Sequence, residues 1–518
     1  MRGYRLLKHS GQINLISKVK QALTEQELKL TDKSFSAFFM GAGYFCGEIV
    51  VRQYLLIRIG GWLGLNHALL YASGKRGGKV IYPLPKAWRK TISQHGFKVA
   101  NFRSSLLWQL YIIGGFLYGV SQIFKIVFSG MTSLCSKDIK PKRHVYFAHL
   151  NAGNLPQGRE GEKSYDIVSW YLQWSKSSQN FDAVHHSVPN VANKIVGAVE
   201  LVYQSEMLPP LIGFVAIVKF VVWAMCSCFI ALIDCFRGRW WHAFLLNQAA
   251  LSAQLRSLPK SRLACEYLFH NSNWIYKPLW TYEAEKVGSK ITFYFYSSNC
   301  ENFKKNDTKT SISYGWKAMS WPNYLVWDSW QADFVRASVG NSCRISIVGP
   351  IWFQSSLAEL SKFSSPCVAV FDVIPYRKSR YISLGIDNEF YTPDVTNPFL
   401  QQVSNTIFKQ RLFMYWKRKR SVGYLTHPLY LQMTDKLAKN NHIKLVDPGI
   451  SAERVIEASD AVISMPFTST ALIAREMGKP SVYYDPTGLL MKDDPAGHGI
   501  PVLSNTTELE SWLSAQAN

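Results

Sequence analysis

The chain has 518 residues, of which 47% are hydrophobic and 18% charged, so it is long enough for two or three domains and is not compositionally disordered. Its nine cysteines form no pair of CxxC clusters, which argues against a disulfide scaffold or a zinc site. The net charge is +23, and residues 1–150 hold 22 Lys and Arg against five Asp and Glu. Because these cations alternate with long apolar segments, we expect an anionic membrane surface as partner and no nucleic acid.

Residues 1–140 are predicted to form a basic, helical, membrane-associating region. The first 20 residues are basic but lack a following apolar run, so we expect no cleaved secretory signal and a largely cytosolic protein. Residues 104–124 carry no charge, and about 20 helical residues are needed to cross a bilayer core. The segment therefore fits a membrane span, an in-plane helix or a buried core helix. Residues 207–233 form a second candidate, interrupted by Lys219.

From residue 144 the pattern becomes α/β, with strand-like runs separated by loops and helical spacing. Residues 141–352 are predicted to form an N-terminal Rossmann-like acceptor domain with a hydrophobic insertion at 205–262. Residues 353–518 are predicted to form a C-terminal Rossmann-like domain for a nucleotide-sugar donor. The strands expected in these two domains are 144–150, 290–298 and 344–350 in the first, and 367–375, 421–428, 442–448, 460–465 and 481–486 in the second.

Two such domains are predicted to face each other across a cleft, because ligands of open α/β sheets bind at the carboxyl ends of the strands.

Three consecutive hydroxyls follow the apolar strand expected at 460–465. Thr468, Ser469 and Thr470 stand at the start of a helix that Gly478 ends. An ordinary helix cap needs one hydroxyl, whereas three beside a helix N-terminus favour a phosphate site.

A histidine in "THP" follows the strand expected at 421–428. His427, restrained by Pro428, is placed to donate to a phosphate and to carry a proton to a leaving group.

His427-Pro428 followed by the string PFTST at 466–470 resembles the bacterial polysaccharide-biosynthesis PFTS-motif proteins. More distantly, it is similar to bacterial sialyltransferases of the GT-B fold. The resemblance implies that His427 contacts the donor phosphate and assists its departure, that Thr468, Ser469 and Thr470 bind that phosphate, and that Pro428 belongs to the same nucleotide-binding site. The donor implied is a CMP-activated sugar, such as a nonulosonic acid, with no other cofactor.

Five carboxylates are further candidates. The acceptor hydroxyl needs a general base, for which Glu283 and Asp166 are the candidates in the first domain. In the second domain, strand-end Asp372 is expected to serve the ribose or to order a loop, Glu457 to reach the ribose, and Asp485 to be a second cleft carboxylate. No Asp-x-Asp stands in a strand-end loop, so we expect a mechanism without metal.

The function this predicts is a membrane-associated glycosyltransferase at the cytoplasmic face of the bacterial inner membrane. It would transfer a sugar to a growing surface polysaccharide or glycolipid, such as capsule or lipopolysaccharide. Two alternatives remain open: a nucleotide-sugar epimerase or hydrolase of the same fold, and a non-catalytic membrane-bound assembly protein.

Overall fold

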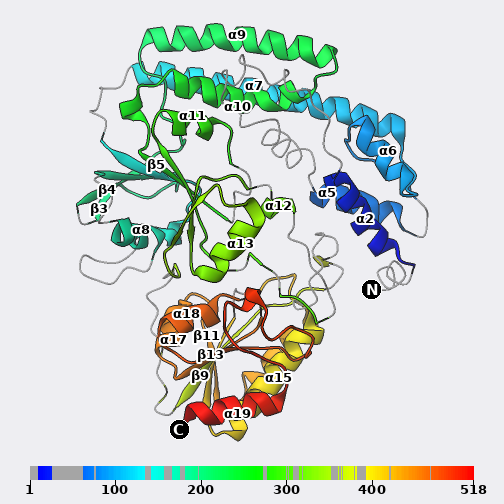
Figure 1. Cartoon of the computed structure of the whole chain (residues 1–518), viewed down its shortest axis with the longest axis vertical. Helices are drawn as coiled ribbons and strands as arrows, with labels where there is room; N and C mark the ends of the chain where they lie inside the picture. The colour runs from blue at the N-terminus through cyan, green and yellow to red at the C-terminus, as the bar shows by residue number, and fades with distance from the viewer. Residues whose placement is uncertain are drawn as a thin grey trace.

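The computed structural model describes residues 10–25, 62–74, 78–134, 142–156, 166–175, 181–196, 198–271, 277–298, 300–301, 303–306, 314–317, 319–351, 360, 363, 366–377, 380–381, 392–418, 422–466 and 468–517. Three parts follow one another along the long axis of the molecule (Figure 1). A layer of long helices lies at one end, an eight-stranded sheet with its helices in the middle, and a six-stranded sheet with its helices at the other end.

The first sheet has the strand order β3-β4-β2-β1-β5-β6-β7-β8. Neighbouring strands are parallel except β3 and β4, which are antiparallel. The central strands β1 and β5 are buried at every position, as expected of strands covered on both faces. The strands are β1 (His144–Phe147), β2 (Ala183–His186), β3 (Lys194–Val196), β4 (Val199–Tyr203), β5 (Glu266–His270), β6 (Lys290–Tyr294), β7 (Asn323–Val326) and β8 (Arg344–Ile347).

The second sheet is entirely parallel, in the order β11-β10-β9-β12-β13-β14. Numbered from its own first strand, this is the 3-2-1-4-5-6 order of a dinucleotide-binding fold. The strands are β9 (Cys367–Asp372), β10 (Phe413–Arg418), β11 (Ile443–Val446), β12 (Ala461–Ser464), β13 (Ser481–Tyr484) and β14 (Val502–Leu503). Two α/β units in succession, the first mostly parallel and the second entirely so, confirm the GT-B-like fold class predicted from the sequence.

The helices that accompany the sheets begin at residues suited to their first turns. Asp328 caps α13 by accepting from the Gln331 amide at 2.9 Å, and Ser451 caps α17 in the same way. With the first sheet lie α8 (Ile167–Ser175), α10 (Trp241–Arg256), α11 (Trp280–Lys286), α12 (Tyr314–Lys317), α13 (Ser329–Val339), η2 (Ala152–Asn154) and η3 (Lys260–Arg262). With the second lie α15 (Pro393–Lys409), α16 (Pro428–Leu437), α17 (Ala452–Glu457), α18 (Thr470–Glu476), α19 (Thr506–Ala517) and η5 (Pro495–Gly497).

The helical layer consists of α7 (Asn101–Leu134), α9 (Phe214–Phe236) and the buried helix α10, on which α7 lies (Figure 1). Glycines permit the close approach of α7 to α10. A Cβ atom at Gly119 would lie 2.7 Å from the Cβ and Cγ atoms of Leu246, and one at Gly115 would lie 2.7 Å from Phe244. Three shorter helices pack near the N-terminal end of α7: α2 (Gln12–Glu25), α5 (Trp62–Ala72) and α6 (Lys86–Gln94).

Both apolar segments expected to meet a membrane are helical, but their limits differ from the prediction. Helix α7 continues past Lys125 to Leu134. Helix α9 begins only at Phe214, because two prolines precede it and Gly213 adopts a positive φ of 81°.

One predicted strand was wrong. No strand lies among the described residues of 421–428; the strand of this unit is β10, at Phe413–Arg418. The aromatic run before the cations explains the difference, since Tyr415 and Trp416 are fully buried and Lys417 is buried with them.

Candidate active site at the facing edges of the two sheets

Each sheet has one point at which its strand order reverses. In the first sheet the reversal lies between β1 and β5, and in the second between β9 and β12. Open α/β sheets bind ligands outside the carboxyl ends of their strands at such a point. The segments that end or follow these four strands are therefore the candidate functional segments.

The carboxyl edges of the two sheets face each other. Ser298, shortly after β6, donates from its hydroxyl and its amide to the Ser469 hydroxyl, at 3.0 and 3.3 Å. Nearby, Asp328 after β7 forms an ion pair with Arg475 of α18 at 3.2 Å and a hydrogen bond with His498 at 2.9 Å. A ligand at the second sheet's reversal would thus lie next to the first sheet.

The turn after β12 is held by its own hydroxyls. Thr468 Oγ1 donates to the carbonyl of Met465 at 2.8 Å, and Thr470 Oγ1 lies 2.7 Å from the Ser464 hydroxyl. Thr470 Oγ1 also donates to Thr468 Oγ1 at 3.3 Å. These bonds fix the path of the chain from strand to helix.

Ser469 has a different position from its two neighbours. It is the first residue before α18, but its side chain makes no capping bond to that helix. Its hydroxyl instead meets Ser298 of the first sheet. Of the three hydroxyls predicted to hold phosphate, Ser469 is the one that reaches the junction between the sheets.

His427 caps α16 at the same edge of the second sheet. Its Nδ1 accepts from the Leu429 amide at 3.2 Å, and its own amide donates to the Pro375 carbonyl at 3.0 Å, just beyond β9. An accepting Nδ1 leaves the ring proton on Nε2 in the neutral form. Partial burial, and then the neighbouring Arg377, lower the pKa of His427, so the neutral ring with an Nε2–H donor is favoured at pH 7.

Asp372 supports the segment that carries His427. It is the last residue of β9, and its Oδ2 accepts from the Tyr430 hydroxyl at 2.6 Å. Tyr430 lies in the first turn of α16, where its amide donates to the His427 carbonyl at 3.0 Å. Burial raises the pKa of Asp372 to about 6, although the bond from Tyr430 opposes that rise. Asp372 and His427 are thus brought together through one helix turn.

Two histidines stand at the reversal of the first sheet. His149, shortly after β1, has a positive φ of 56°, and His270 ends β5. His270 Nε2 lies 3.3 Å from the His149 carbonyl, and its ring packs 5.6 Å from those of Tyr294 and Tyr296. Burial lowers the pKa of both histidines, that of His270 to about 4. The sequence analysis missed this pair, although a histidine at a strand end was the signal that identified His427.

The two predicted base candidates lie in separate places. Asp166 Oδ1 accepts from the Ser169 amide at 2.8 Å and so caps the start of α8. Glu283 lies on α11 beside α10, where its Oε1 accepts from Arg256 at 3.1 Å. Burial raises the pKa of Glu283 to about 7 despite Arg256 and Lys286. The structure does not bring these two carboxylates together, and α11 lies toward the helical layer (Figure 1).

The remaining carboxylates of the second domain also differ in position. Glu457 is exposed at the end of α17, and therefore on the side where β12 begins. Asp485 is fully buried and holds its own turn, accepting from the amides of Thr487 and Leu490 at 2.9 Å each.

A buried lysine and glutamate near the carboxyl edge were not foreseen. Lys417, on β10, donates from Nζ to the Pro448 carbonyl at 3.1 Å. Burial lowers its pKa, while Glu453 at the start of α17 and Asp447 oppose that shift. A lysine inside an apolar strand is the sequence signal that could have identified this site.

Among the described residues, no group of three or more His, Cys or acidic side chains is placed to hold a metal ion.

A family model described as "Polysaccharide biosynthesis PFTS motif protein" matches residues 220–513. The chain belongs to this family. In this PFTS motif protein the string that names the family is residues 466–469, the turn after β12. The match begins within α9 and ends within α19, so it includes His270, Asp372 and His427 and leaves His149 outside.

A search of curated proteins finds no match to the chain. Among solved structures, the PFTS motif protein is similar to a variant of the wall teichoic acid polymerase TagF, with 11% identity, a TM-score of 0.37, and coverage of 78% of this chain and 90% of that one. It is also similar to the UDP-GlcNAc 2-epimerase of Methanocaldococcus jannaschii, with 10% identity, a TM-score of 0.37, and coverage of 72% and 92%. UGT2 of Phytolacca americana gives 10% identity, a TM-score of 0.33, and coverage of 72% and 83%.

Proposed function

We propose that this PFTS motif protein is a glycosyltransferase that moves a sugar from a nucleotide-activated donor to a bacterial surface polysaccharide or glycolipid. The expected donor is a CMP-activated sugar, such as a nonulosonic acid. One observation carries the proposal: the PFTS turn lies at the strand-order reversal of the second sheet, His427 is bonded there to Pro375 just beyond β9, and Ser469 meets the first sheet. This geometry supports a donor phosphate held on one sheet and an acceptor presented from the other.

On the donor side, each residue has a distinct task. Ser469 donates its hydroxyl to the donor phosphate, exchanging its contact with Ser298 for the ligand. His427 donates a hydrogen bond from Nε2 to the same phosphate and stabilises the charge that develops there as the bond to the sugar breaks. Thr468 and Thr470 keep the turn in shape through their internal bonds. Asp372 acts through Tyr430 by holding the first turn of α16.

On the acceptor side, we place the general base at His149 rather than at Glu283 or Asp166. A side chain in the left-handed backbone region is uncommon, and such strain is concentrated at functional sites. Its lowered pKa keeps the ring neutral at pH 7 and able to accept the proton of an acceptor hydroxyl. His270 holds the His149 carbonyl from the neighbouring strand.

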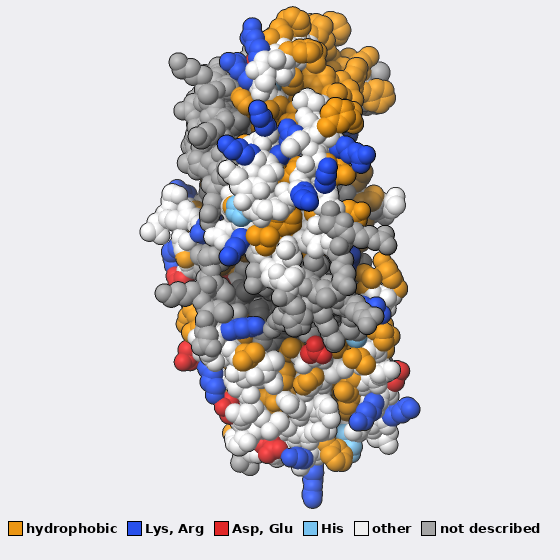
Figure 2. Space-filling view, turned by 90° about the vertical axis from the view of Figure 1, so that its right-hand side faces the viewer, with side chains coloured by type: hydrophobic (Ala, Val, Ile, Leu, Met, Phe, Trp, Pro, Cys, Tyr) orange, Lys and Arg blue, Asp and Glu red, His pale blue; other side chains and the backbone are white. Residues whose placement is uncertain are grey.

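The helical layer supports work at a membrane surface. Helices α7 and α9 are both long and apolar enough to cross a membrane. We propose that they lie in the plane of the cytoplasmic leaflet, because α7 is packed along α10. Figure 2 shows hydrophobic side chains gathered at this end of the molecule, with lysines and arginines beside them. The exposed apolar residues include Leu106, Leu110, Ile113, Leu117, Phe124, Phe128 and Met131 of α7, and Val218, Val222, Met225, Phe229, Leu232 and Phe236 of α9.

Thermal stabilisation by nucleotides tests the donor assignment. Full-length protein is heated with CMP, UDP, GDP or ADP, alongside Ser469→Ala and, as matched control, Ser511→Ala on the exposed side of α19. We expect CMP to raise Tm, Ser469→Ala to weaken that response, and Ser511→Ala to retain it. Stabilisation by UDP or GDP instead of CMP would show that the donor carries that nucleotide and not CMP. No response to any nucleotide would overturn the transferase proposal.

A further inference from the structure

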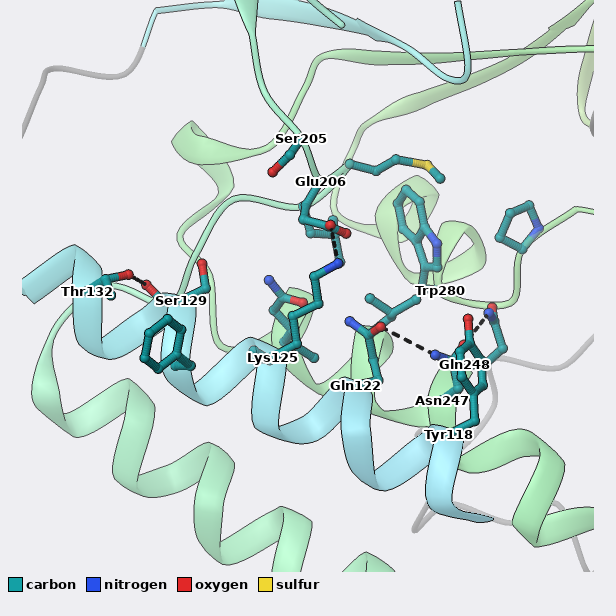
Figure 3. Close-up of a pocket in the computed structure, with 17 residues that line it drawn as sticks. Tyr118, Gln122, Lys125, Ser129, Thr132, Ser205, Glu206, Asn247, Gln248 and Trp280 are labelled. Atoms are coloured by element: carbon teal, nitrogen blue, oxygen red, sulfur yellow. Dashed lines mark hydrogen bonds and ion pairs between the residues drawn. The ribbon is translucent and has the colours of Figure 1, made fainter. Parts of the chain in front are cut away.

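A pocket separate from the facing sheet edges lies in the helical layer. It has a volume of about 480 Å³, within the range of about 300–1,000 Å³ typical of small-molecule sites. Its walls come from α7, α10, the segment after β4 and the start of α11. In Figure 3, Lys125 reaches from α7 toward Glu206, and the Trp280 indole lies across the pocket from α7.

Carboxamides form a connected row in this pocket. Asn247 Nδ2 lies 3.5 Å from Gln122 Oε1, and Gln248 Nε2 donates to Asn247 Oδ1 at 3.1 Å. Gln248 Oε1 accepts from the Leu279 amide at 2.9 Å, which fixes the direction of the row. Asn247 and Gln248 are both more than nine-tenths buried. Carboxamides both donate and accept, which suits hydroxyl groups of a sugar.

The pocket carries no net charge. Among its described lining residues Lys125 is the only cation, and it forms an ion pair with Glu206, the only carboxylate of the lining. A phosphate would have to separate this pair and leave Glu206 beside an anion. The lining therefore favours an uncharged polar group over a phosphate.

The pocket is continuous with the exposed apolar face of α7. Tyr118 and Phe128 line the pocket and are also 49% and 71% exposed on the helix surface. Leu117, Phe124 and Met131 extend the same exposed face. A ligand with a polar head in the pocket would thus have its apolar part over α7.

We infer that this pocket binds the uncharged sugar head group of a glycolipid, whose hydrocarbon chain lies along the exposed face of α7. The inference rests on the proposed function, in which the acceptor is anchored to the membrane through such a glycolipid. The carboxamide row recognises sugar hydroxyls, the Lys125–Glu206 pair disfavours a charged head, and α7 provides the contact with the chain.

Photolabelling in phosphatidylcholine nanodiscs tests this inference on the full-length protein. The probes are decyl glucoside, decyl galactoside and decyl N-acetylglucosaminide with a diazirine on the first alkyl carbon, and decyl tetraethylene glycol with the same group serves as the chain-matched control. Gln122→Leu removes one end of the carboxamide row, and Ser129→Phe narrows the pocket from the same helix. Gln109→Leu makes the same change as Gln122→Leu at an exposed position of α7 outside the lining.

We expect at least one glycoside to label residues 118–132 or 205–208. The probe concentration that gives half-maximal labelling should be about tenfold higher in Gln122→Leu and Ser129→Phe, and unchanged in Gln109→Leu. Equal labelling by the ethylene glycol probe, labelling elsewhere, or indifference to both pocket variants would overturn the inference. Stabilisation by CMP, UDP, GDP and ADP is measured on the same samples. A nucleotide response without selective labelling defeats only the pocket inference, and selective labelling without any nucleotide response overturns the transferase proposal while leaving glycolipid binding in the pocket.

Discussion

Replacing Asp372 by Asn should stabilise the protein, and more so at high pH. The carboxyl is 1% exposed, and its pKa is raised from 3.8 to about 6 because burial disfavours the charged form. In the unfolded chain it ionises normally, so the folded state binds more protons between these two pKa values. Unfolding free energy must therefore fall as pH rises through that interval.

The magnitude follows from the two pKa values. Relative to a group that stays neutral, the buried carboxyl costs about 1.6 kcal/mol at pH 5 and about 3 kcal/mol at pH 7.5. Asn keeps the shape and can still accept from the Tyr430 hydroxyl. The advantage of Asp372→Asn should thus grow by about 1.4 kcal/mol between these pH values, or about 3 to 6 °C in Tm for a domain of this size.

Differential scanning fluorimetry at pH 5 and 7.5 measures this difference. The matched control is Asp493→Asn, because the Asp493 side chain is exposed; its difference from the wild type should not change between the two pH values. If the difference between Asp372→Asn and wild type is the same at both pH values, the carboxyl is solvated and the reasoning fails.

Three further changes are predicted. His427→Ala should lower turnover of a CMP-sugar by about 10²- to 10³-fold, as for loss of one hydrogen-bond donor to developing charge. Loss of the α16 cap should also cost about 1 kcal/mol of stability. Near-normal turnover measured as CMP release would remove His427 from the mechanism. Gly119→Ala should lower Tm because the added Cβ would lie 2.7 Å from Leu246. Gly114→Ala has open space around it and should raise stability by about 1 kcal/mol through helix propensity. Calorimetry that showed both variants stabilised would contradict the packing of α7 on α10. Asp328→Asn should make the junction of the two sheets more accessible to protease, because the variant loses the ion pair with Arg475 and weakens the bond with His498. These partners depress the pKa of Asp328 against the effect of burial, so its contribution to stability should be present above pH 3.8 and be lost as pH falls further. A protease pattern identical to wild type would show that the cluster does not hold the sheets together.

Much of the second sheet could be predicted because its strands are short apolar runs followed by turn residues. Four of the five strands expected there are present, and the segments after β9 and β12 do lie at the strand-order reversal. The failure at β10 has a physical cause. Lys417 is buried with its ammonium bonded to a carbonyl, and composition alone cannot distinguish such a lysine from a solvated one.

The roles of individual hydroxyls and carboxylates were beyond local sequence patterns. Ser469 meets Ser298, which is 171 positions away along the chain, so no motif around either residue could report that contact. Glu457 was expected near a ribose, but it lies at the end of its helix, while Glu453, one turn earlier, is the buried carboxylate near Lys417. Which helix end faces the site depends on the direction of the strands, and this is set by the whole sheet.

The most direct test of the central claim is an experimental structure of the protein with CMP bound. The account predicts the phosphate between the ends of β9 and β12, within hydrogen-bonding distance of Ser469 Oγ and His427 Nε2, with the open side of the phosphate toward His149. A nucleotide bound elsewhere, or a phosphate that contacts neither Ser469 nor His427, would contradict it.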